Sequence, residues 1–514
     1  MDMTRKGFLG GAATMFVVAF GLAFALSAQA KVELGSPFAD GMVLQRGMKV
    51  PVWGRADPGE TVKVSFAGQV RTATADAEGR WRVALDKLEA SKTGRTLSVN
   101  EVEVKDVLVG EVWFASGQSN MEMPLVGDDP RFFDRQGRLT AQMTRRPLVR
   151  YAYACEHSWS AEPKPFATYR VEWKRMMPEN LLTKPSFSAV AVYFALELDA
   201  ALDVPIGIVG SYWGATGIDA WTPRCGYEGK DELAESASYP IHGPGDWKDE
   251  YKQGPIVEPR EQPTVLWNEM VEPWCPMAMR GFIWYQGCHD ALCKGGSDHY
   301  RAKMHALYDG WSAKFENPAL KLYFVQLAPH SCSWYDVQLA QAQFAAEEPN
   351  AALVTTADVG NFDDIHPNDK GPVAKRLAAL ALAHDYGFRG LVADAPTLKA
   401  CRWEKDRVVL SFNDADGWYM YNSDWSVDVP FELAGAGGQW KKAYLLNANG
   451  GAKVTKRWVT KGFVEGADLV VAADGVENPV KVRYLHESPW IGGLFAQTGV
   501  PLGPFEERKE ETND

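Results

Sequence analysis

The most constraining feature of this sequence is a long middle section, from about 106 to 390, in which strand-like and helix-like segments alternate. Apolar runs predict strands over 107–115, 206–212, 281–285, 320–328 and 351–356, and helices over 188–202, 300–315, 337–346 and 373–384. Strands that alternate with helices form a mainly parallel sheet with helices packed on its faces. The middle section therefore predicts an α/β domain whose site lies at the carboxyl ends of the strands.

Two sections without such helices flank the α/β section. Residues 31–105 show the polar–apolar alternation of half-buried strands, as in Thr61–Phe66, with turns between them. This spacing predicts a small N-terminal β-sandwich. The same kind of pattern returns over 391–505, and the charged residues 506–514 are expected to be a disordered tail.

Within the α/β section, residues 224–263 form a polar stretch that contains Gly and Pro and has no clear period. Long stretches of this kind are often functional loops. We expect a long loop that contributes to a substrate cleft.

The first thirty residues have the features of a secretory signal peptide. Arg5 and Lys6 precede an apolar run over 12–26, and the segment ends in Ser27-Ala28-Gln29-Ala30, a small-x-small cleavage pattern. The apolar run is shorter than the roughly 20 residues of a membrane span. We therefore expect cleavage after Ala30 and export to the periplasm or the extracellular space. No membrane association is expected after cleavage; an uncleaved anchor is the alternative.

The net charge and the cysteines of the chain limit which partners and metals are expected. The 514 residues include 54 Lys+Arg and 66 Asp+Glu, a net charge of −12, and no Lys/Arg-rich run stands out, which argues against nucleic acid. The seven cysteines are odd in number, and Cys288 and Cys293 are close enough in sequence to bridge across a loop. Cys and His spacing matches no zinc motif, so no metal is predicted.

The segment Gly117-Gln118-Ser119-Asn120-Met121 is the most informative for chemistry, because it follows the predicted strand 107–115. A serine at a strand end, beside a glycine that permits a tight turn, is held exposed and rigid as a nucleophile must be. A serine nucleophile needs a base, and His366 in Asp363-Asp364-Ile365-His366-Pro367 follows the last predicted strand. A carboxylate close to a histidine can orient its ring.

Two further strand ends offer donors for an oxyanion. Ser211-Tyr212-Trp213-Gly214-Ala215-Thr216 follows one strand, and Trp284-Tyr285-Gln286-Gly287 follows another. The backbone N–H groups of Ser119 and Gly214 and the side-chain amide of Gln286 are the candidate donors.

Four motifs, in this order, resemble the sialate O-acetylesterase group of the SGNH-hydrolase superfamily of carbohydrate esterases. They are Gly117–Met121, Trp213–Thr216, Trp284–Gly287 and Asp364–Pro367, and flanking segments such as Phe38–Arg46 and Gly499–Phe505 also match. The resemblance implies a three-layer, flavodoxin-like SGNH domain between two β-sandwich-like regions.

The resemblance also implies roles for single residues. Ser119 is the nucleophile, His366 is the general base, and Ser119 N–H, Gly214 N–H and Gln286 form the oxyanion hole. Asp363 is favoured as the orienting acid by the Asp-x-x-His spacing, with Asp364 as its rival. Residues expected to contact the substrate are Asn120, Trp213, Trp284 and Asp290.

The chain departs from the group's Trp-Tyr-Gln-Gly-Glu-Ser-Asn, because Cys288, His289 and Asp290 replace the last three residues. An ionised Asp290 at an oxyanion position would repel the developing charge, so the donor role is placed on Gln286. Milder departures are Ala215, where a second Gly is common, and Ala340, where an Arg is expected.

The implied reaction is a two-step acyl transfer that needs no metal or organic cofactor. The substrate partner is an O-acetylated glycan, either sialic acid or a plant polysaccharide such as xyloglucan or xylan. Two other hypotheses are a non-catalytic glycan-binding protein on the same fold and a different acyl hydrolase, such as a lipase or thioesterase.

Overall fold

The computed structural model describes residues 32–129, 131–154, 157–184, 186–252, 256–332, 334–361, 363–422, 429–446, 453, 463–464, 468–486 and 492–510. The expected signal peptide over 1–30 and its cleavage site lie outside these residues. Among the described helices, none has the length and apolar character of a membrane span.

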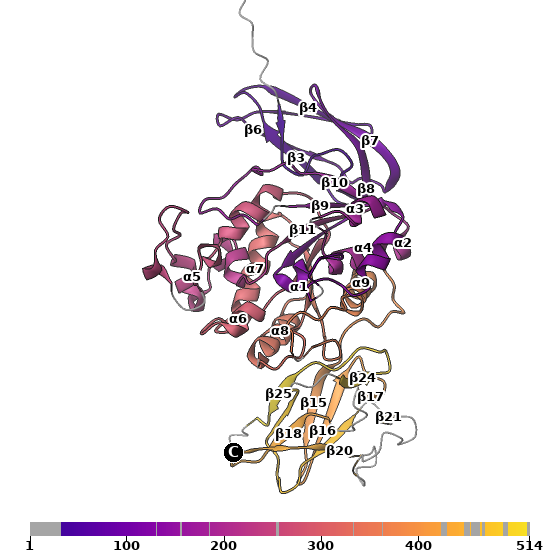
Figure 1. Ribbon diagram of the computed structural model, residues 1–514, viewed down its shortest axis with the longest axis vertical. Helices are drawn as coiled ribbons and strands as arrows, with labels where there is room; N and C mark the ends of the chain where they lie inside the picture. The colour runs from indigo at the N-terminus through magenta and orange to yellow at the C-terminus, as the bar shows by residue number, and fades with distance from the viewer. Residues whose placement is uncertain are drawn as a thin grey trace, which may run out of the picture. The chain divides into compact units, whose positions relative to one another are not determined.

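The N-terminal section consists of two β-sheets that share one hydrophobic core (Figure 1). The first sheet has the antiparallel order β1-β3-β6, and the second is built from β2, β4, β5, β7 and the long strand β8. The bounds are β1 (Glu33–Leu34), β2 (Val43–Gln45), β3 (Val50–Arg55), β4 (Thr61–Phe66), β5 (Gln69–Thr74), β6 (Arg80–Leu85), β7 (Ser91–Val99) and β8 (Val102–Gly117). Because β8 is continuous, the domain boundary expected at 105/106 falls inside a strand.

Beyond the N-terminal section, β8 becomes the central strand of the α/β sheet, whose order is β10-β9-β11-β8-β12-β13-β14. All neighbours pair in parallel except the edge strand β10, which is antiparallel to β9. The remaining bounds are β9 (Arg146–Tyr153), β10 (Trp173–Met176), β11 (Ile206–Tyr212), β12 (Gly281–Tyr285), β13 (Lys321–Val325) and β14 (Ala351–Val354). Strands β9 and β11 lie on one side of β8, and β12 and β13 lie on the other, so the strand order reverses at β8. In open α/β sheets, ligands bind at such a point.

Strands β9 and β10 were not expected from the sequence. Arg150 lies inside β9 and breaks its apolar pattern, yet its side chain is buried and its Nη1 lies 2.9 Å from Asp106 Oδ2. A charge can be buried in this way when it is paired.

Helices cover both faces of the sheet and give three layers. Alternate residues of β8 separate the two cores: Trp113 and Ala115 pack with α4 and α9, whereas Val112 and Phe114 pack with α7. Helices α4 and α9 lie side by side (Figure 1). The helix bounds are α1 (Ser119–Glu122), α2 (Gly137–Met143), α3 (Pro178–Leu181), α4 (Ala189–Leu202), α5 (Ala234–Ser238), α6 (Cys288–Leu292), α7 (Tyr300–Lys314), α8 (Tyr335–Glu347) and α9 (Gly371–Asp385). The expected three-layer α/β fold is confirmed.

The polar stretch 224–263 is largely irregular, as expected. Its described residues contain the short helix α5 and 3₁₀ turns at Arg224–Tyr227, Asp231–Leu233, Asp249–Tyr251 and Pro259–Glu261.

The C-terminal section forms three sheets around a separate core. Their orders are β15-β16-β22-β20, β21-β17-β24 and β19-β18-β23-β25. The bounds are β15 (Thr397–Trp403), β16 (Val408–Asn413), β17 (Trp418–Asn422), β18 (Phe431–Ala434), β19 (Trp440–Lys442), β20 (Tyr444–Leu446), β21 (Phe463–Val464), β22 (Leu469–Ala472), β23 (Lys481–Tyr484), β24 (Gly492–Ala496) and β25 (Phe505–Arg508). The disordered tail expected from 506 was wrong for its first residues, because β25 pairs with β23 through Arg508.

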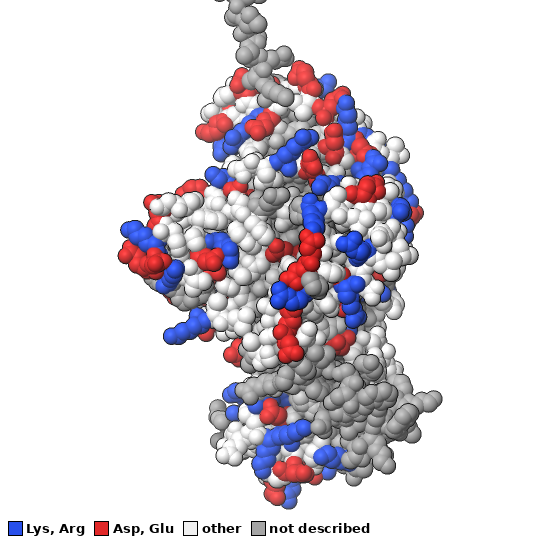
Figure 2. Space-filling view, viewed as in Figure 1, with Lys and Arg blue, Asp and Glu red and all other residues white. Residues whose placement is uncertain are grey.

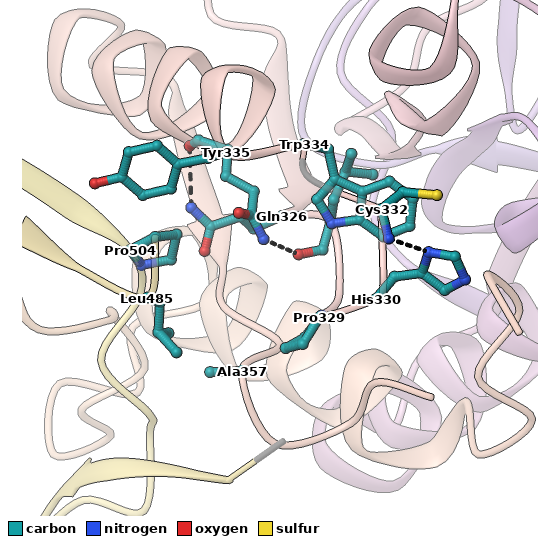
Figure 3. Close-up of a pocket in the computed structure, with 11 residues that line it drawn as sticks. Gln326, Pro329, His330, Cys332, Trp334, Tyr335, Ala357, Leu485 and Pro504 are labelled. Carbon is teal, nitrogen blue, oxygen red and sulfur yellow. Dashed lines mark hydrogen bonds between the residues drawn. The ribbon is translucent and has the colours of Figure 1, made fainter. Parts of the chain in front are cut away.

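The C-terminal section contacts the α/β section through specific hydrogen bonds. Tyr335 OH donates to Phe505 O over 2.8 Å, and Thr355 Oγ1 donates to Pro501 O over 2.7 Å. A cavity of about 20 Å³ lies here, with Leu485 and Pro504 on one side and His330 accepting from the Cys332 N–H (Figure 3). This volume holds about one water molecule, so the cavity is too small for a sugar.

Surface charge is mixed in sign. On the face shown in Figure 2, Lys and Arg side chains are interspersed with Asp and Glu. That face therefore has no basic stripe of the kind found on nucleic-acid-binding proteins.

Candidate active site

The three strand ends singled out in the sequence meet at one edge of the sheet. Gly117, the last residue of β8, is in register with Tyr212 of β11 on one side and with Tyr285 of β12 on the other. The loops that follow these strands therefore converge, as expected for a parallel sheet.

A sharp turn presents Ser119 immediately after β8. Gly117 has φ +138°, and a Cβ at this position would lie 2.3 Å from Tyr285 O, so only glycine fits. Gln118 then fixes the turn, because its N–H donates to Tyr285 O and its Oε1 accepts from Gly287 N. Ser119 begins the short helix α1.

Ser119 and His366 form the predicted pair. Ser119 Oγ and His366 Nε2 lie 2.8 Å apart, a hydrogen-bonding distance. His366 lies on the loop between β14 and α9, 247 residues further along the chain. The edge of the Phe132 ring packs on the His366 ring, with 5.0 Å between centroids. This arrangement can transfer a proton from the serine to the imidazole.

The carboxylate beside His366 belongs to Asp364, so the preference for Asp363 was wrong in this geometry. Asp364 Oδ1 lies 3.3 Å from His366 Nδ1 and accepts the His366 backbone N–H over 2.9 Å. Asp363 is exposed, and its backbone N–H donates to Asn361 Oδ1. The loop folds back by a two-residue turn, which brings the nearer carboxylate to the ring.

The pKa of His366 depends on its burial and on two neighbouring charged residues. Burial and the charge of Lys370 lower the pKa of His366, while the Asp364 carboxylate opposes this shift. Burial also lowers the pKa of Lys370 to about 7. His366 is therefore neutral near pH 7, the state that a general base requires.

Asn120 links the parts of the site together and is not available to substrate. Its side chain is buried, its Nδ2 donates to Ile365 O over 2.9 Å, and its Oδ1 accepts from Lys370 Nζ over 2.5 Å. These bonds hold the histidine loop against α1. The expected substrate contact through Asn120 was wrong.

Gly214 lies beside the serine, as expected of an oxyanion donor. A Cβ on Gly214 would lie 3.2 Å from Ser119 Cβ, so the two residues are in close contact. Its N–H donates to Glu122 Oε2 over 2.6 Å, and Glu122 Oε1 lies 2.9 Å from His157 Nε2. In the hydrogen bonds of the described residues, the Ser119 N–H has no protein acceptor. The Ser119 N–H is therefore placed to serve an incoming oxygen, whereas the Gly214 N–H can do so only after Glu122 Oε2 has left it.

Gln286 is not placed to serve as the third donor, which corrects the expectation. Its amide Nε2 donates to Thr216 O over 2.9 Å and contacts Asp290 Oδ2, and its Oε1 accepts from Tyr300 OH over 2.8 Å. The side chain is fully buried. Both amide hydrogens are thus committed to protein acceptors.

Asp290 is buried as well. Its Oδ2 accepts from Ile218 N over 3.2 Å, and burial raises its pKa. It also lines a cavity of about 300 Å³ together with His289, so the expected substrate contact through Asp290 stays a prediction. Cys288 and Cys293, which the sequence allowed to bridge, are both free thiols.

The two tryptophans that were expected to contact substrate, Trp213 and Trp284, differ in their burial. Trp284 is completely buried within β12 and packs edge-on against Trp221, so the expected substrate contact was wrong. Trp213 is half-buried: His157 stacks on its ring at 4.7 Å, and the Arg260 guanidinium lies 5.1 Å from its centroid. The expected substrate contact through Trp213 stays a prediction.

Comparison with known proteins matches most of the α/β section of this chain to a family. The family model described as carbohydrate esterase, sialic acid-specific acetylesterase matches residues 109–383, more than half of the chain. The chain belongs to this carbohydrate esterase family. Human sialate O-acetylesterase is 27% identical over 399 residues, with 69% of this chain and 71% of the human protein covered. The mouse enzyme is 28% identical over 411 residues, with 70% and 74% covered.

A solved structure extends the likeness to the flanking sections. A carbohydrate acetylesterase from Xanthomonas citri superposes with a TM-score of 0.77 at 30% identity, covering 93% of this chain and all of that chain. The SGNH-type fold expected from the sequence is confirmed, and the chain is a carbohydrate acetylesterase by family.

Sequence reasoning missed three site residues of this acetylesterase. Glu122 lies one helical turn after Ser119, so its position on α1 was a usable signal. Lys370 and His157 carried no such signal, because their contacts depend on how distant loops fold.

We expect the protein to keep its esterase activity in mildly acidic solution. His366 must be neutral to act, and burial and Lys370 place its pKa below the ordinary 6.5. As pH falls, kcat/KM should therefore decrease through a midpoint below pH 6.5. A pH series of initial rates on a small acetyl ester measures this midpoint, and a midpoint clearly above 6.5 would contradict the assignment.

Proposed function

We propose that this chain is an exported serine esterase that removes O-acetyl groups from glycans through Ser119, His366 and Asp364. The observation that carries the proposal is the 2.8 Å contact between Ser119 Oγ and His366 Nε2 at the carboxyl edge of the sheet. Membership of the carbohydrate esterase family supports the reaction class.

The proposed reaction has two steps. His366 Nε2 accepts the Ser119 Oγ proton as the oxygen attacks the acetyl carbonyl, and then donates that proton to the departing sugar oxygen. Water, deprotonated by His366, attacks the acetyl-serine. The bond between the acetyl carbon and Ser119 Oγ then breaks, acetate leaves, and His366 returns the proton to Ser119 Oγ. Asp364 stabilises the imidazolium that forms in each step.

The negative oxygen of the tetrahedral intermediate is proposed to bind the N–H groups of Ser119 and Gly214. Glu122 holds the Gly214 N–H in the free protein. The substrate carbonyl must therefore displace Glu122 Oε2, and the His157 contact provides that carboxylate with a second partner.

Export is part of the proposal because of the leader-like features of residues 1–30. Mass spectrometry of the protein recovered outside the cytoplasm tests it, with a mature N-terminus at Lys31 expected. The two carbohydrate classes considered from the sequence, O-acetylated sialic acid and acetylated plant polysaccharide, are both compatible with the catalytic residues.

Acetate release from purified protein tests the function. We expect release from 4-nitrophenyl acetate and from at least one O-acetylated glycan, among sialic acids, xyloglucan and xylan. Folded protein that binds such a glycan but releases no acetate would instead support a non-catalytic glycan-binding protein. Preference for long acyl esters over acetyl esters would support a lipase or thioesterase.

A further inference from the structure

Two adjoining cavities extend away from the catalytic residues. We define the inner cavity by Glu122, Phe132, Tyr153, His157, Ser186 and Tyr212, among its lining residues; its volume is about 470 Å³. We define the outer cavity by Tyr151, Tyr153, Thr168, Tyr169, Arg170 and Ser186, among its lining residues; its volume is about 440 Å³. Each is within the size range of small-molecule sites.

The inner cavity opens beside the reacting atoms. Phe132 packs on the His366 ring, and Glu122 accepts from the Gly214 N–H next to Ser119. Tyr153 and Ser186 line both cavities, so the outer cavity continues directly from the inner one. An acetylated sugar whose ester reaches Ser119 would occupy the inner cavity, and the rest of its chain would enter the outer cavity.

We infer that the outer cavity is a subsite that binds further sugar residues of a glycan chain whose acetylated, uncharged sugar occupies the inner cavity. The inference rests on the proposed function, whose substrate class it narrows.

The lining of the outer cavity suits sugar rings. Tyr153 and Tyr169 supply aromatic rings, which pack against the apolar face of a sugar. Tyr169 is half-buried, and its OH accepts from Trp274 Nε1 over 3.3 Å, which fixes the ring to the core. A ring fixed before binding loses little entropy on binding.

The charges of the inner cavity favour an uncharged sugar there. Among the described residues that line it, Lys184 pairs with Asp128, and Glu122 lies 2.9 Å from His157. A sialic acid would bring a carboxylate close to Glu122 without an unpaired lysine or arginine to receive it in that lining. Like charges placed together oppose binding.

The test compares acetylated substrates of increasing length in the wild-type protein and in Tyr169→Ala. For the wild type, kcat/KM for acetate release should be at least about tenfold higher on an acetylated neutral oligosaccharide than on the acetylated neutral monosaccharide. Tyr169→Ala should lower kcat/KM on the oligosaccharide by about tenfold, chiefly by raising KM. Its kcat/KM values on the monosaccharide and on 4-nitrophenyl acetate should equal those of the wild type.

Two control variants keep the result interpretable. Tyr169→Phe retains the ring and should keep most of the oligosaccharide preference, which separates stacking from loss of fold. Phe388→Ala removes an aromatic side chain that is 40% exposed outside both cavities and should change nothing. Equal losses on all three substrates in Tyr169→Ala, or no chain-length preference in the wild type, would overturn the subsite. A higher kcat/KM on acetylated sialic acid than on the neutral monosaccharide would overturn its uncharged ligand.

Failure of the proposed function has a different signature. In that case the wild type releases no acetate even from 4-nitrophenyl acetate. Calorimetry with the deacetylated neutral oligosaccharide then tests the subsite directly: at least about tenfold weaker binding by Tyr169→Ala supports it. Equal binding by both proteins, or no binding by either, would overturn it.

Discussion

Ser119→Ala is expected to lower kcat/KM for acetate release by at least about 10⁴-fold, because acyl transfer loses its nucleophile. The alanine removes only the Oγ atom, whose hydrogen bond is to His366. The backbone N–H of residue 119 and the Gly117 turn remain, so binding of substrate should change little. Initial rates of acetate release on a small ester and on an acetylated glycan measure the effect.

Thermal unfolding supplies the control for Ser119→Ala. Ser119 starts a turn fixed by Gln118 and Gly117, and those contacts are unchanged by the substitution. We expect a Tm close to that of the wild type. Substantial acetate release by a folded Ser119→Ala protein would exclude the proposed covalent mechanism.

Asp364→Asn and Asp363→Asn form a matched pair with opposite expectations. Asp364 Oδ1 lies 3.3 Å from His366 Nδ1, whereas Asp363 is exposed. Replacing the Asp364 carboxylate with a neutral amide removes the charge that stabilises the imidazolium, so kcat should fall by about 100-fold or more. Asp363→Asn should stay within about twofold of the wild type, as for most exposed surface changes.

The pH profile of Asp364→Asn adds an independent readout. The Asp364 charge opposes the lowering of the His366 pKa. Without this charge, the midpoint of the acidic limb should move to lower pH while the plateau rate falls. A large loss in Asp363→Asn with little loss in Asp364→Asn would return the orienting role to Asp363.

The architecture was predictable because it depends on patterns that survive in a single sequence. Apolar runs at strand and helix lengths placed most of the α/β elements, and Ser119 and His366 both follow such strands. Parallel strands end at one edge of a sheet, so their convergence followed from connectivity alone. Strand β9 was missed because Arg150, a residue type that is usually exposed, is buried by its ion pair with Asp106.

The finer assignments depend on side-chain direction, which spacing does not define. Gln286 follows a strand end as expected, but its amide hydrogens bond to Thr216, which lies 70 residues away in sequence, and to Asp290, one helical turn further along. Trp284 lies in a central strand covered on both faces, so its ring packs in the core. The choice between Asp363 and Asp364 depends on a single turn of the loop.

The central claim is that acetyl transfer passes through Ser119. The most direct measurement is to mix the wild-type protein with excess 4-nitrophenyl acetate, quench with acid within the first turnovers, and map the modified peptide by mass spectrometry. We expect one acetyl group on Ser119, and none on that peptide in Ser119→Ala. Acetate released at the full rate with the acetyl group on another residue, or with no acetyl-enzyme formed at all, would contradict it.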